Sequence, residues 1–289
     1  MKKGWKIFWA VCASAAGVGI ILCIIGVGMG GSLTEINRVY ESGRFFSTGY
    51  NSEEMEHLAA SEDGGGQSGK NPEDITQYRD IHELEAELTY LTVILEEYEG
   101  DSVEVDASDI SSKLQDRLIC KQEDGKLEIN YTDKGLWKQI GKNNAGRLLI
   151  KVPAGTQFEE VSMGIGAGEL SADNILANNL KISVGTGTAD ITSFESEELE
   201  VECGTGILTL KGEARSTADI DCGIGEVNWD VVGSEENYNY KVNCGIGAVS
   251  VGNRDYSGFS GESYVDNSAA GEMDIKCGIG RININFGEE

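Results

Sequence analysis

Four cysteines stand in the same short motif, Cys-Gly-x-Gly followed by alternating apolar residues, and cysteine can bind metals, form disulfides or act as a nucleophile. The four are Cys203, Cys222, Cys244 and Cys277. Zinc needs ligands that converge tetrahedrally, usually with a Cys-x-x-Cys pair, but these cysteines follow one another at intervals of 19, 22 and 33 residues. Disulfides remain an alternative for a protein outside the cell. We expect a structural core column of buried free thiols, with no metal and no cofactor.

A second group that could do chemistry is a set of carboxylates on two successive repeats. These are Glu200, Glu202, Asp219 and Asp221. Paired strands would bring them into an acidic square, and like charges opposite one another destabilise a sheet unless something compensates. The square is a weak candidate for a divalent-cation patch. The alternative is a solvated face flanked by Lys181 and Lys241.

Catalysis finds little support in the sequence. The chain has two histidines, His57 and His82, and no local motif implies a Ser/His/Asp or Cys/His set. Some repetitive β-proteins cleave polysaccharides, and paired carboxylates would be needed for that reaction. The acidic square is the only candidate for such a pair, so we expect that the protein is not an enzyme.

The elements that position these residues are repeats of about 20 residues. The first glycine of each Gly-x-Gly pair falls at positions 164, 185, 204, 223, 245 and 278. Apolar and polar residues alternate on both sides of each pair, which indicates two strands joined at a glycine corner. When the repeats are aligned on their Gly-x-Gly pairs, the residue before the first glycine is Met163, Val184 or one of the four cysteines. We expect these residues to form one column of side chains that points into the stack. The predicted fold class is all-β: a single-domain β-solenoid, a β-helix-like stack of such rungs.

The repeated glycines could indicate a calcium-binding site or corners of the backbone. Calcium-binding β-rolls also repeat glycines at this spacing, but they carry Asp two residues after the second glycine. Here that position holds Gly168, Ala189, Leu208, Val227, Val249 or Ile282. We therefore reject the roll and assign the glycines to corners, which need a positive φ or a close approach of the backbone.

The residues before the repeats divide into an anchor and a tether. Residues 7–30 carry no charge and are long enough to span a membrane as one helix. The lysines that precede them place residues 1–6 in the cytoplasm, and a cleaved signal peptide is the competing interpretation. Residues 31–76 predict a flexible extracellular tether, and residues 77–289 predict the β-solenoid. Within the latter, residues 81–98 fit either a helix or strands.

The charge of the chain limits its partners. All 49 acidic residues lie beyond residue 30, where the net charge is −29. Such a charge argues against nucleic acid and anionic lipid as partners of the folded part. It suits a soluble surface domain that faces a cationic or neutral partner.

The last interval between glycine pairs is about a dozen residues longer than the others. The excess falls within residues 252–271, which are rich in Gly and Ser and include Tyr256, Phe259 and Tyr264. We expect a loop that leaves the stack. Aromatic side chains in such a loop could form a partner-binding surface for a sugar or a protein. The alternative is that the rings fold back and shield the C-terminal edge from pairing with another chain.

The order of these features resembles the bacterial "putative adhesin" family of unknown function. The resemblance covers residues 77–289 and rests on KLEINYTDKGLW (126–137), on RLLIKVPAGTQFEEVSMGIGAGEL (147–170) and on the Gly-x-Gly repeats. The family implies a repetitive β-solenoid domain. Some members are linked to the response to cell-envelope stress, and no family binding residue can be carried over to this chain.

These observations predict a bacterial single-pass membrane protein with its C-terminal domain extracellular. The expected function is that of a non-catalytic, adhesin-like binding module for an extracellular or cell-envelope protein or glycan. The alternative is a scaffold or sensor of envelope stress that works with membrane partners, for which small-residue spacings in residues 13–30 would permit close helix packing.

Overall fold

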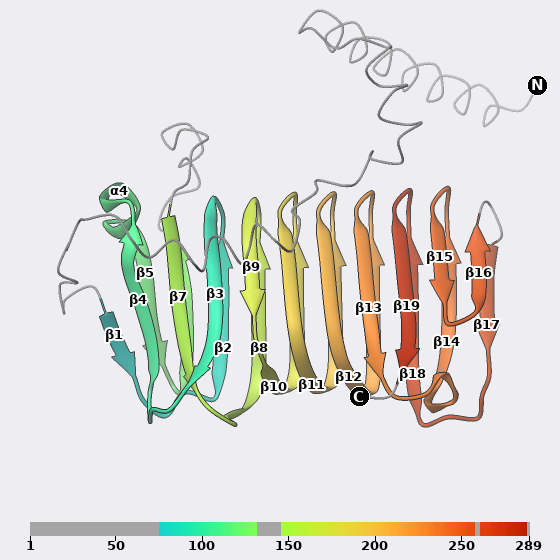
Figure 1. The fold of residues 1–289 in the computed structure, drawn as a ribbon, viewed down its shortest axis with the longest axis horizontal. Helices are drawn as coiled ribbons and strands as arrows, with labels where there is room; N and C mark the ends of the chain where they lie inside the picture. Colours follow the sequence, from blue (N-terminus) through green and yellow to red (C-terminus); the bar gives the residue numbers. More distant parts are fainter. Residues whose placement is uncertain (1–74, 132–145, 258–260, 288–289) are drawn as a thin grey trace, which may run out of the picture. The chain divides into compact units, whose positions relative to one another are not determined.

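The computed structural model describes residues 75–131, 146–257 and 261–287, and these belong to one compact unit (Figure 1). The predicted anchor (7–30) and nearly all of the predicted tether (31–76) lie outside the described residues. No helix in the described part of the chain is long and apolar enough to cross a membrane. The first strand begins at Ile75, two residues before the predicted start of the solenoid.

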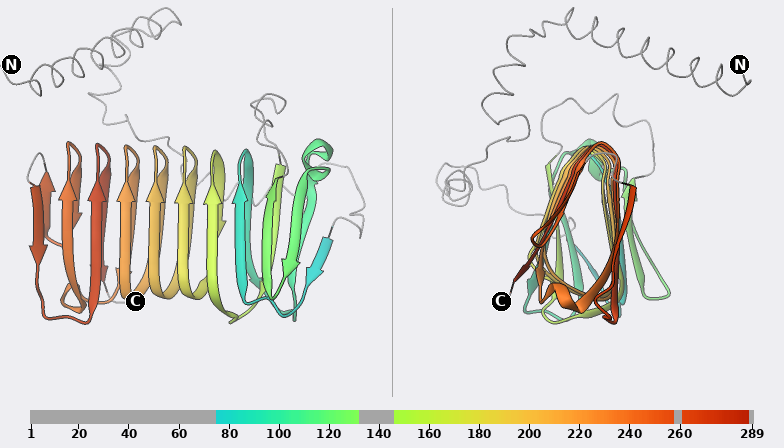
Figure 2. Two further views of the ribbon diagram at one scale, coloured as in Figure 1. Left: turned by 180° about the vertical axis from the view of Figure 1, so that it is seen from behind. Right: turned by 90° about the vertical axis from the view of Figure 1, so that its right-hand side faces the viewer.

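Each rung of the stack has two walls joined by a narrow turn and by a floor, as the end-on view in Figure 2 shows. Strand β11 (Thr188–Cys203) passes through all three sides. Its first residues lie in one wall, Phe194 and Ser196 point inward from the floor, and its last residues lie in the other wall. Inward residues alternate with outward ones within each side, which is the expected pattern for strands with one buried face.

Hydrogen-bonded strands run along both walls of the stack. In spatial order, the first wall contains β5 (Leu118–Glu123), β6 (Lys126–Tyr131), β2 (Glu83–Leu88), β8 (Gln157–Ile165), β10 (Ile175–Val184), the ends of β11 and β12 (Ile207–Cys222), β18 (Gly271–Cys277), β14 (Tyr238–Cys244) and β17 (Gly261–Val265). The second wall contains β1 (Ile75–Tyr78), β4 (Val103–Ile110), β7 (Gly146–Pro153), β3 (Leu91–Tyr98), β9 (Gly168–Ala172), the starts of β11 and β12, β13 (Glu226–Val232), β19 (Arg281–Gly287), β15 (Ala248–Val251) and β16 (Arg254–Ser257). Two short helices, α4 (Ser112–Gln115) and η3 (Glu235–Asn237), connect strands. Residues 81–98 form strands β2 and β3 rather than a helix.

The order of rungs in space differs from their order in the chain. The last rung, β18–β19, lies between β12–β13 and β14–β15, with parallel pairing on both sides (Figure 1). At the other end, β2–β3 likewise lies between β6–β7 and β8–β9. The order of the rungs in space therefore departs from the order of the chain at both ends of the stack.

The expected loop at residues 252–271 is also largely strand. Strands β16 and β17 add one more layer beyond β15 and β14, antiparallel to both. The chain must pass through this layer before it can return to the interior position of β18, and this path accounts for the long final interval. The layer covers the edge that β14 and β15 would otherwise expose.

The register of the first glycine repeat is two residues away from the sequence alignment. Val184 pairs with Ile165 rather than with Met163, which pairs with Ile182. The corresponding glycine corners then fall at Gly166, Gly185, Gly204 and Gly223, each 19 residues after the last. The sequence offers two overlapping Gly-x-Gly pairs here, Gly164-Ile165-Gly166 and Gly166-Ala167-Gly168. Only the second pair forms the turn, whereas the prediction from spacing had used the first.

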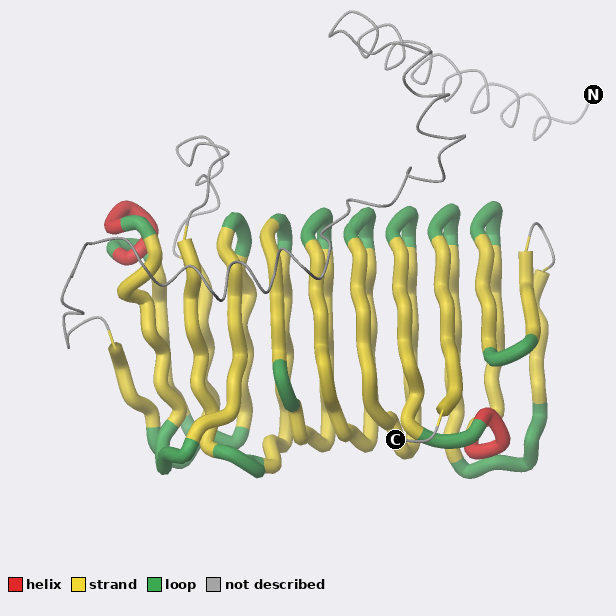
Figure 3. The backbone as a smooth tube through the Cα atoms, viewed as in Figure 1, coloured by secondary structure: helices red, strands yellow, loops and turns green. Residues whose placement is uncertain are grey.

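Close approach of the backbone requires the glycines at the repeated corners, and only in the first corner does a glycine, Gly168, also have a positive φ, of +139°. A Cβ on Gly206 would lie 2.3 Å from the carbonyl oxygen of Gly187, and one on Gly225 would lie 2.3 Å from that of Gly206. Real Cβ atoms do not come this close to a backbone oxygen. The second position of the pair must therefore be glycine for one turn to stack against the next. Figure 3 shows the resulting aligned row of turns along one side of the stack.

The floor of the stack contains a complementary large and small pair. Trp229 is fully buried, donates its indole N–H to the carbonyl of Gly212 at 3.1 Å, and lies 6.1 Å from the ring of Phe194. A Cβ on Gly212 would meet the Phe194 ring at 2.5 Å. The absence of a side chain at Gly212 therefore makes room for the Phe194 ring, and the Gly212 carbonyl holds the indole of Trp229.

Candidate partner-binding surface

The acidic square is assembled in the predicted register, and lysines form ion pairs with three of its four carboxylates. Glu200 pairs with Asp219, and Glu202 pairs with Asp221, on neighbouring strands. The Lys181 ammonium lies 2.7 Å from Glu200 and 3.4 Å from Glu202.

On the other side of the square, the inserted last rung supplies Lys276 instead of the expected Lys241. Its ammonium lies 3.1 Å from Asp219 and 3.2 Å from Asp274. Lys241 pairs instead with Glu262 at the end of the stack. Among the described residues, the four carboxylates are not one of the groups whose ligand atoms lie close enough to hold a metal. The two lysines offset part of the repulsion between the like charges.

The predicted aromatic residues do not gather at one place. Tyr256 lies on β16 opposite Val249 and packs against the core. Tyr264 lies on β17 opposite Lys241 and is 60% exposed. Phe259 lies outside the described residues. The structure thus places the two described tyrosines on terminal strands in different walls, not in a common loop.

An exposed apolar row that the sequence analysis did not single out runs along the turns. It consists of Ile224, Ile279 and Ile246, the central residues of three Gly-Ile-Gly turns, and we call it the isoleucine ridge. Their exposed fractions are 53%, 57% and 63%. Insertion of the last rung makes the three neighbours, because the Ile279 turn pairs with the Ile224 turn on one side and the Ile246 turn on the other. Contiguous exposed apolar side chains on an acidic domain make this row a candidate binding surface.

The turns hold the ridge rigidly. The backbone N–H of Ile279 donates to the carbonyl of Gly223 at 2.8 Å, and that of Ile246 donates to the carbonyl of Gly278 at 2.8 Å. These bonds fix the spacing of the isoleucines at the distance between paired strands, about 4.8 Å. A rigid row loses little conformational entropy when it binds.

The cysteine column lies directly beneath the ridge. Its spatial order is Cys203, Cys222, Cys277, Cys244, and all four thiols are free and buried. The Cys222 sulfur lies 2.8 Å from the position that a Cβ on Gly280 would take, so thiol and glycine pack as a unit. Hydrogen bonds with the thiols of Cys203 and Cys277, together with burial, raise the pKa of the Cys222 thiol. The same contacts act in the opposite direction on its neighbours: hydrogen bonding with the Cys222 thiol lowers the pKa of the Cys203 thiol and lowers that of the Cys277 thiol to about 7. The column supports the turns, and burial of the sulfur atoms is what limits their reactivity.

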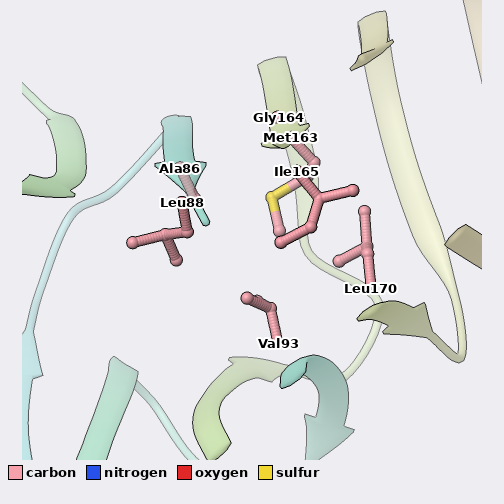
Figure 4. Close-up of a pocket in the computed structure, with 7 residues that line it drawn as sticks. All are labelled: Ala86, Leu88, Val93, Met163, Gly164, Ile165 and Leu170. Atoms are coloured by element: carbon pink, nitrogen blue, oxygen red, sulfur yellow. The ribbon is translucent and has the colours of Figure 1, made fainter. Parts of the chain in front are cut away.

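The cavity in Figure 4 offers no alternative ligand site. It lies between the β2–β3 and β8–β9 rungs, and its lining is apolar apart from the backbone. The lining residues are Ala86, Leu88, Val93, Met163, Gly164, Ile165 and Leu170. Small-molecule sites need a few convergent polar groups to orient a ligand, and this interior space has none.

This stack of parallel rungs, with glycine turns along one side, can be compared with known protein families and solved structures. A family model described as Toastrack DUF4097 matches residues 81–288. The chain belongs to the DUF4097 family. The Toastrack domain therefore spans nearly all of the described residues, and no match was found among curated proteins.

Two solved structures are similar to this Toastrack domain. One is described as a "putative cell adhesion protein" from Clostridium sporogenes, with 15% identity, 74% of this chain and 98% of that chain covered, and a TM-score of 0.41. The other is described as a "putative adhesin" from Bacteroides fragilis, with 10% identity, 73% and 94% coverage, and a TM-score of 0.34.

Proposed function

We propose that this Toastrack protein is a non-catalytic binding module, anchored to the cell membrane through residues 7–30, that binds a protein partner outside the cell through the isoleucine ridge. The observation that carries the proposal is the exposure of three adjacent isoleucines on a rigid row of turns. Burial of a fully exposed isoleucine side chain stabilises by about 1.5–3 kcal/mol, so a partner that covers these half-exposed side chains gains a substantial part of a binding free energy.

The chemistry of the ridge favours a protein over a glycan or a membrane. Isoleucine offers aliphatic surface without hydrogen-bonding groups, which suits an apolar groove on a protein. The outward residues beside Ile224 are Asp221 and Glu226, and their carboxylates oppose anionic lipid headgroups.

The charges beside Ile279 also disfavour a second copy of this chain. Lys276 and Arg281 flank Ile279 on the two walls. If two ridges met around a two-fold axis at Ile279, the cations of one copy would face the same cations of the other. A different protein, with an apolar groove bordered by acidic groups near Ile279, avoids this repulsion.

Site-specific photo-crosslinking in the cells that make the protein tests the proposal. A photoreactive residue replaces Ile279 in one full-length variant and, in a control variant, the exposed Glu198 of β11, which lies away from the turns. We expect one discrete crosslinked protein from position 279 and not from position 198. Equal crosslinking from both positions, or crosslinking to lipid or to a second copy alone, would contradict the proposal.

The alternative function, a scaffold or sensor of envelope stress with membrane partners, makes a different prediction. Replacing residues 7–30 by an unrelated membrane-spanning helix would abolish that function, because the contacts would lie in the anchor. The same replacement leaves binding through the isoleucine ridge intact, so the two functions are separable in one variant.

A further inference from the structure

His82 is the one histidine among the described residues, and it lies beside two carboxylates. The ligand atoms of His82, Glu83 and Glu159 all lie within 4.8 Å of one another. Residues 82 and 159 are far apart in the chain and meet because β2 pairs in parallel with β8. The three residues lie at the floor corner at the N-terminal end of the stack, remote from the isoleucine ridge.

The backbone on both sides fixes the position of His82. Its N–H donates to the carbonyl of Gly125 at 2.9 Å, and its own carbonyl accepts from the N–H of Glu159 at 2.8 Å. Gly125 has a φ of +80°, and a Cβ there would lie 2.0 Å from Nε2 of His82. The imidazole therefore occupies space that only a glycine leaves open, which sets the orientation of the ring.

A local irregularity brings Glu83 to the same side as His82. Residues in a regular strand alternate between faces, but here two successive residues point outward before the buried Leu84. The same pattern occurs on the neighbouring strand, where Glu159 and Glu160 both point outward before the next buried residue. The matching corners place one imidazole and three carboxylates on a single outer edge.

These carboxylates form no ion pair in the described part of the chain, although Lys126 is close enough to interact with the charges of Glu83 and Glu160. Glu83 pairs in register with Glu160 on one side and with Lys126 on the other. The Lys126 ammonium forms its ion pair with Glu85. Within the described residues no ion pair includes Glu83, Glu159 or Glu160, in contrast to the acidic square, where two lysines supply the positive charge. The edge thus keeps a surplus of negative charge beside a nitrogen ligand.

We propose that His82, Glu83 and Glu159 form a binding site for Zn²⁺. One imidazole nitrogen with two carboxylate oxygens suits zinc, whereas Ca²⁺ and Mg²⁺ take oxygen ligands. Ligand atoms around a tetrahedral zinc with bonds of about 2.1 Å lie about 3.4 Å apart. The side chain of Glu159 is exposed, so rotation of its outer torsions brings its carboxylate to the imidazole, whose orientation is set by Gly125. The fourth position is left to water.

Isothermal titration of the full-length protein in detergent with ZnCl₂ tests the site. We expect one zinc bound through the site, at least tenfold weaker binding in each of His82→Gln and Glu159→Gln, and a zinc-dependent rise in melting temperature that both variants lose. Two matched controls change the same residue types elsewhere, His57→Gln and Glu198→Gln, and both should bind within twofold of the wild type.

Two results would overturn the zinc site. One is zinc affinity in His82→Gln equal to that of the wild type, which would assign the heat to other groups such as the cysteines. The other is an equal loss of affinity in Glu198→Gln, which would show a general effect of charge rather than ligation. Circular dichroism of each variant without zinc verifies that the fold is retained, and the conservative His82→Asn replacement gives a second variant if His82→Gln fails to fold.

Discussion

Cys222 lies directly beside Cys277, in register on neighbouring parallel strands, although 55 residues separate the two in the chain. Cys244, the next cysteine after Cys222 in the sequence, lies on the far side of Cys277. The C-terminal rung is therefore an interior part of the stack, and both the cysteine column and the isoleucine ridge depend on it.

The position of this rung predicts an unusual effect of truncation. A chain that ends at residue 270 loses β18 and β19, so β14 and β15 lose their parallel partners. We expect cooperative loss of the C-terminal third of the stack, measured as a lower melting temperature and increased proteolysis beyond residue 222. A truncated chain as stable as the full-length one would show that the last rung is not interior.

Deletion of residues 255–267 is the matched comparison, because it removes β16 and β17 but no interior rung. Residues 252–254 and 268–270 remain to connect β15 to β18. We expect a folded protein that self-associates, since the edges of β14 and β15 become free. Light scattering would detect the association. A deletion variant that stays monomeric with an unchanged melting temperature would contradict the shielding role of this layer.

The core column predicts opposite outcomes for two substitutions at Cys222. Cys222→Ala leaves a small cavity and should lower the free energy of unfolding by about 1–3 kcal/mol. Cys222→Asp places an unpaired charge among buried side chains and should unfold the neighbouring rungs. Cys120→Ala, at a half-buried position, is the control and should cost less. Denaturant titration measures all three, and loss of partner binding in Cys222→Ala without loss of stability would refute a structural role.

The reactivity of the thiols is set by their burial. The pKa is raised for the Cys222 and Cys244 thiols but lowered for the Cys203 and Cys277 thiols, so the thiolate fraction alone does not protect the column. All four sulfur atoms lie in the core, out of reach of an alkylating reagent. We therefore expect alkylation of the four core cysteines only in denaturant, mapped by mass spectrometry. Rapid labelling of Cys222 in the native protein would contradict the packed column.

One buried polar group should be replaceable with a gain in stability. The Ser196 hydroxyl is buried in the floor without a hydrogen-bond partner, between Ala177 and Ala214 on the adjacent rungs. Removal of an unsatisfied hydroxyl relieves its desolvation cost, so Ser196→Ala should raise the free energy of unfolding by about 1 kcal/mol. Ser193→Ala, on the exposed side of the same strand, should change it little. A loss of stability in Ser196→Ala would indicate a bond that the structure does not show.

The repeat pattern was enough to predict an all-β, solenoid-like stack, because alternation and glycine spacing are local properties of each rung. The register of the first repeat was not predictable from spacing, since Gly164, Gly166 and Gly168 offer two overlapping Gly-x-Gly pairs. Burial decides between the two pairs. In the observed register, the buried residues Leu170 and Ala172 lie opposite Ala189 and Ile191 on the neighbouring strand.

The order of rungs depends on pairing between distant strands, which no local pattern records. The sequence showed only that the last interval was long, and a loop and an added strand layer fit that length equally well. The isoleucine ridge was missed for the same reason, because Ile224 and Ile279 become neighbours only through the inserted rung. The sequence did contain a signal for the ridge, because three of the Gly-x-Gly turns have isoleucine at the centre. A side chain at the centre of such a tight turn has no room inside the stack and must point to solvent.

Affinity for the partner crosslinked at position 279 tests the proposed function most directly. Ile279→Ser in the full-length protein removes the central side chain of the ridge, and Tyr264→Ser removes the exposed ring of β17 as a control. We predict about tenfold weaker binding for Ile279→Ser, equivalent to about 1.4 kcal/mol, with an unchanged melting temperature and with Tyr264→Ser within twofold of the wild type. Wild-type affinity in Ile279→Ser, together with weakened binding in Tyr264→Ser, would contradict the account and assign binding to the terminal strands instead.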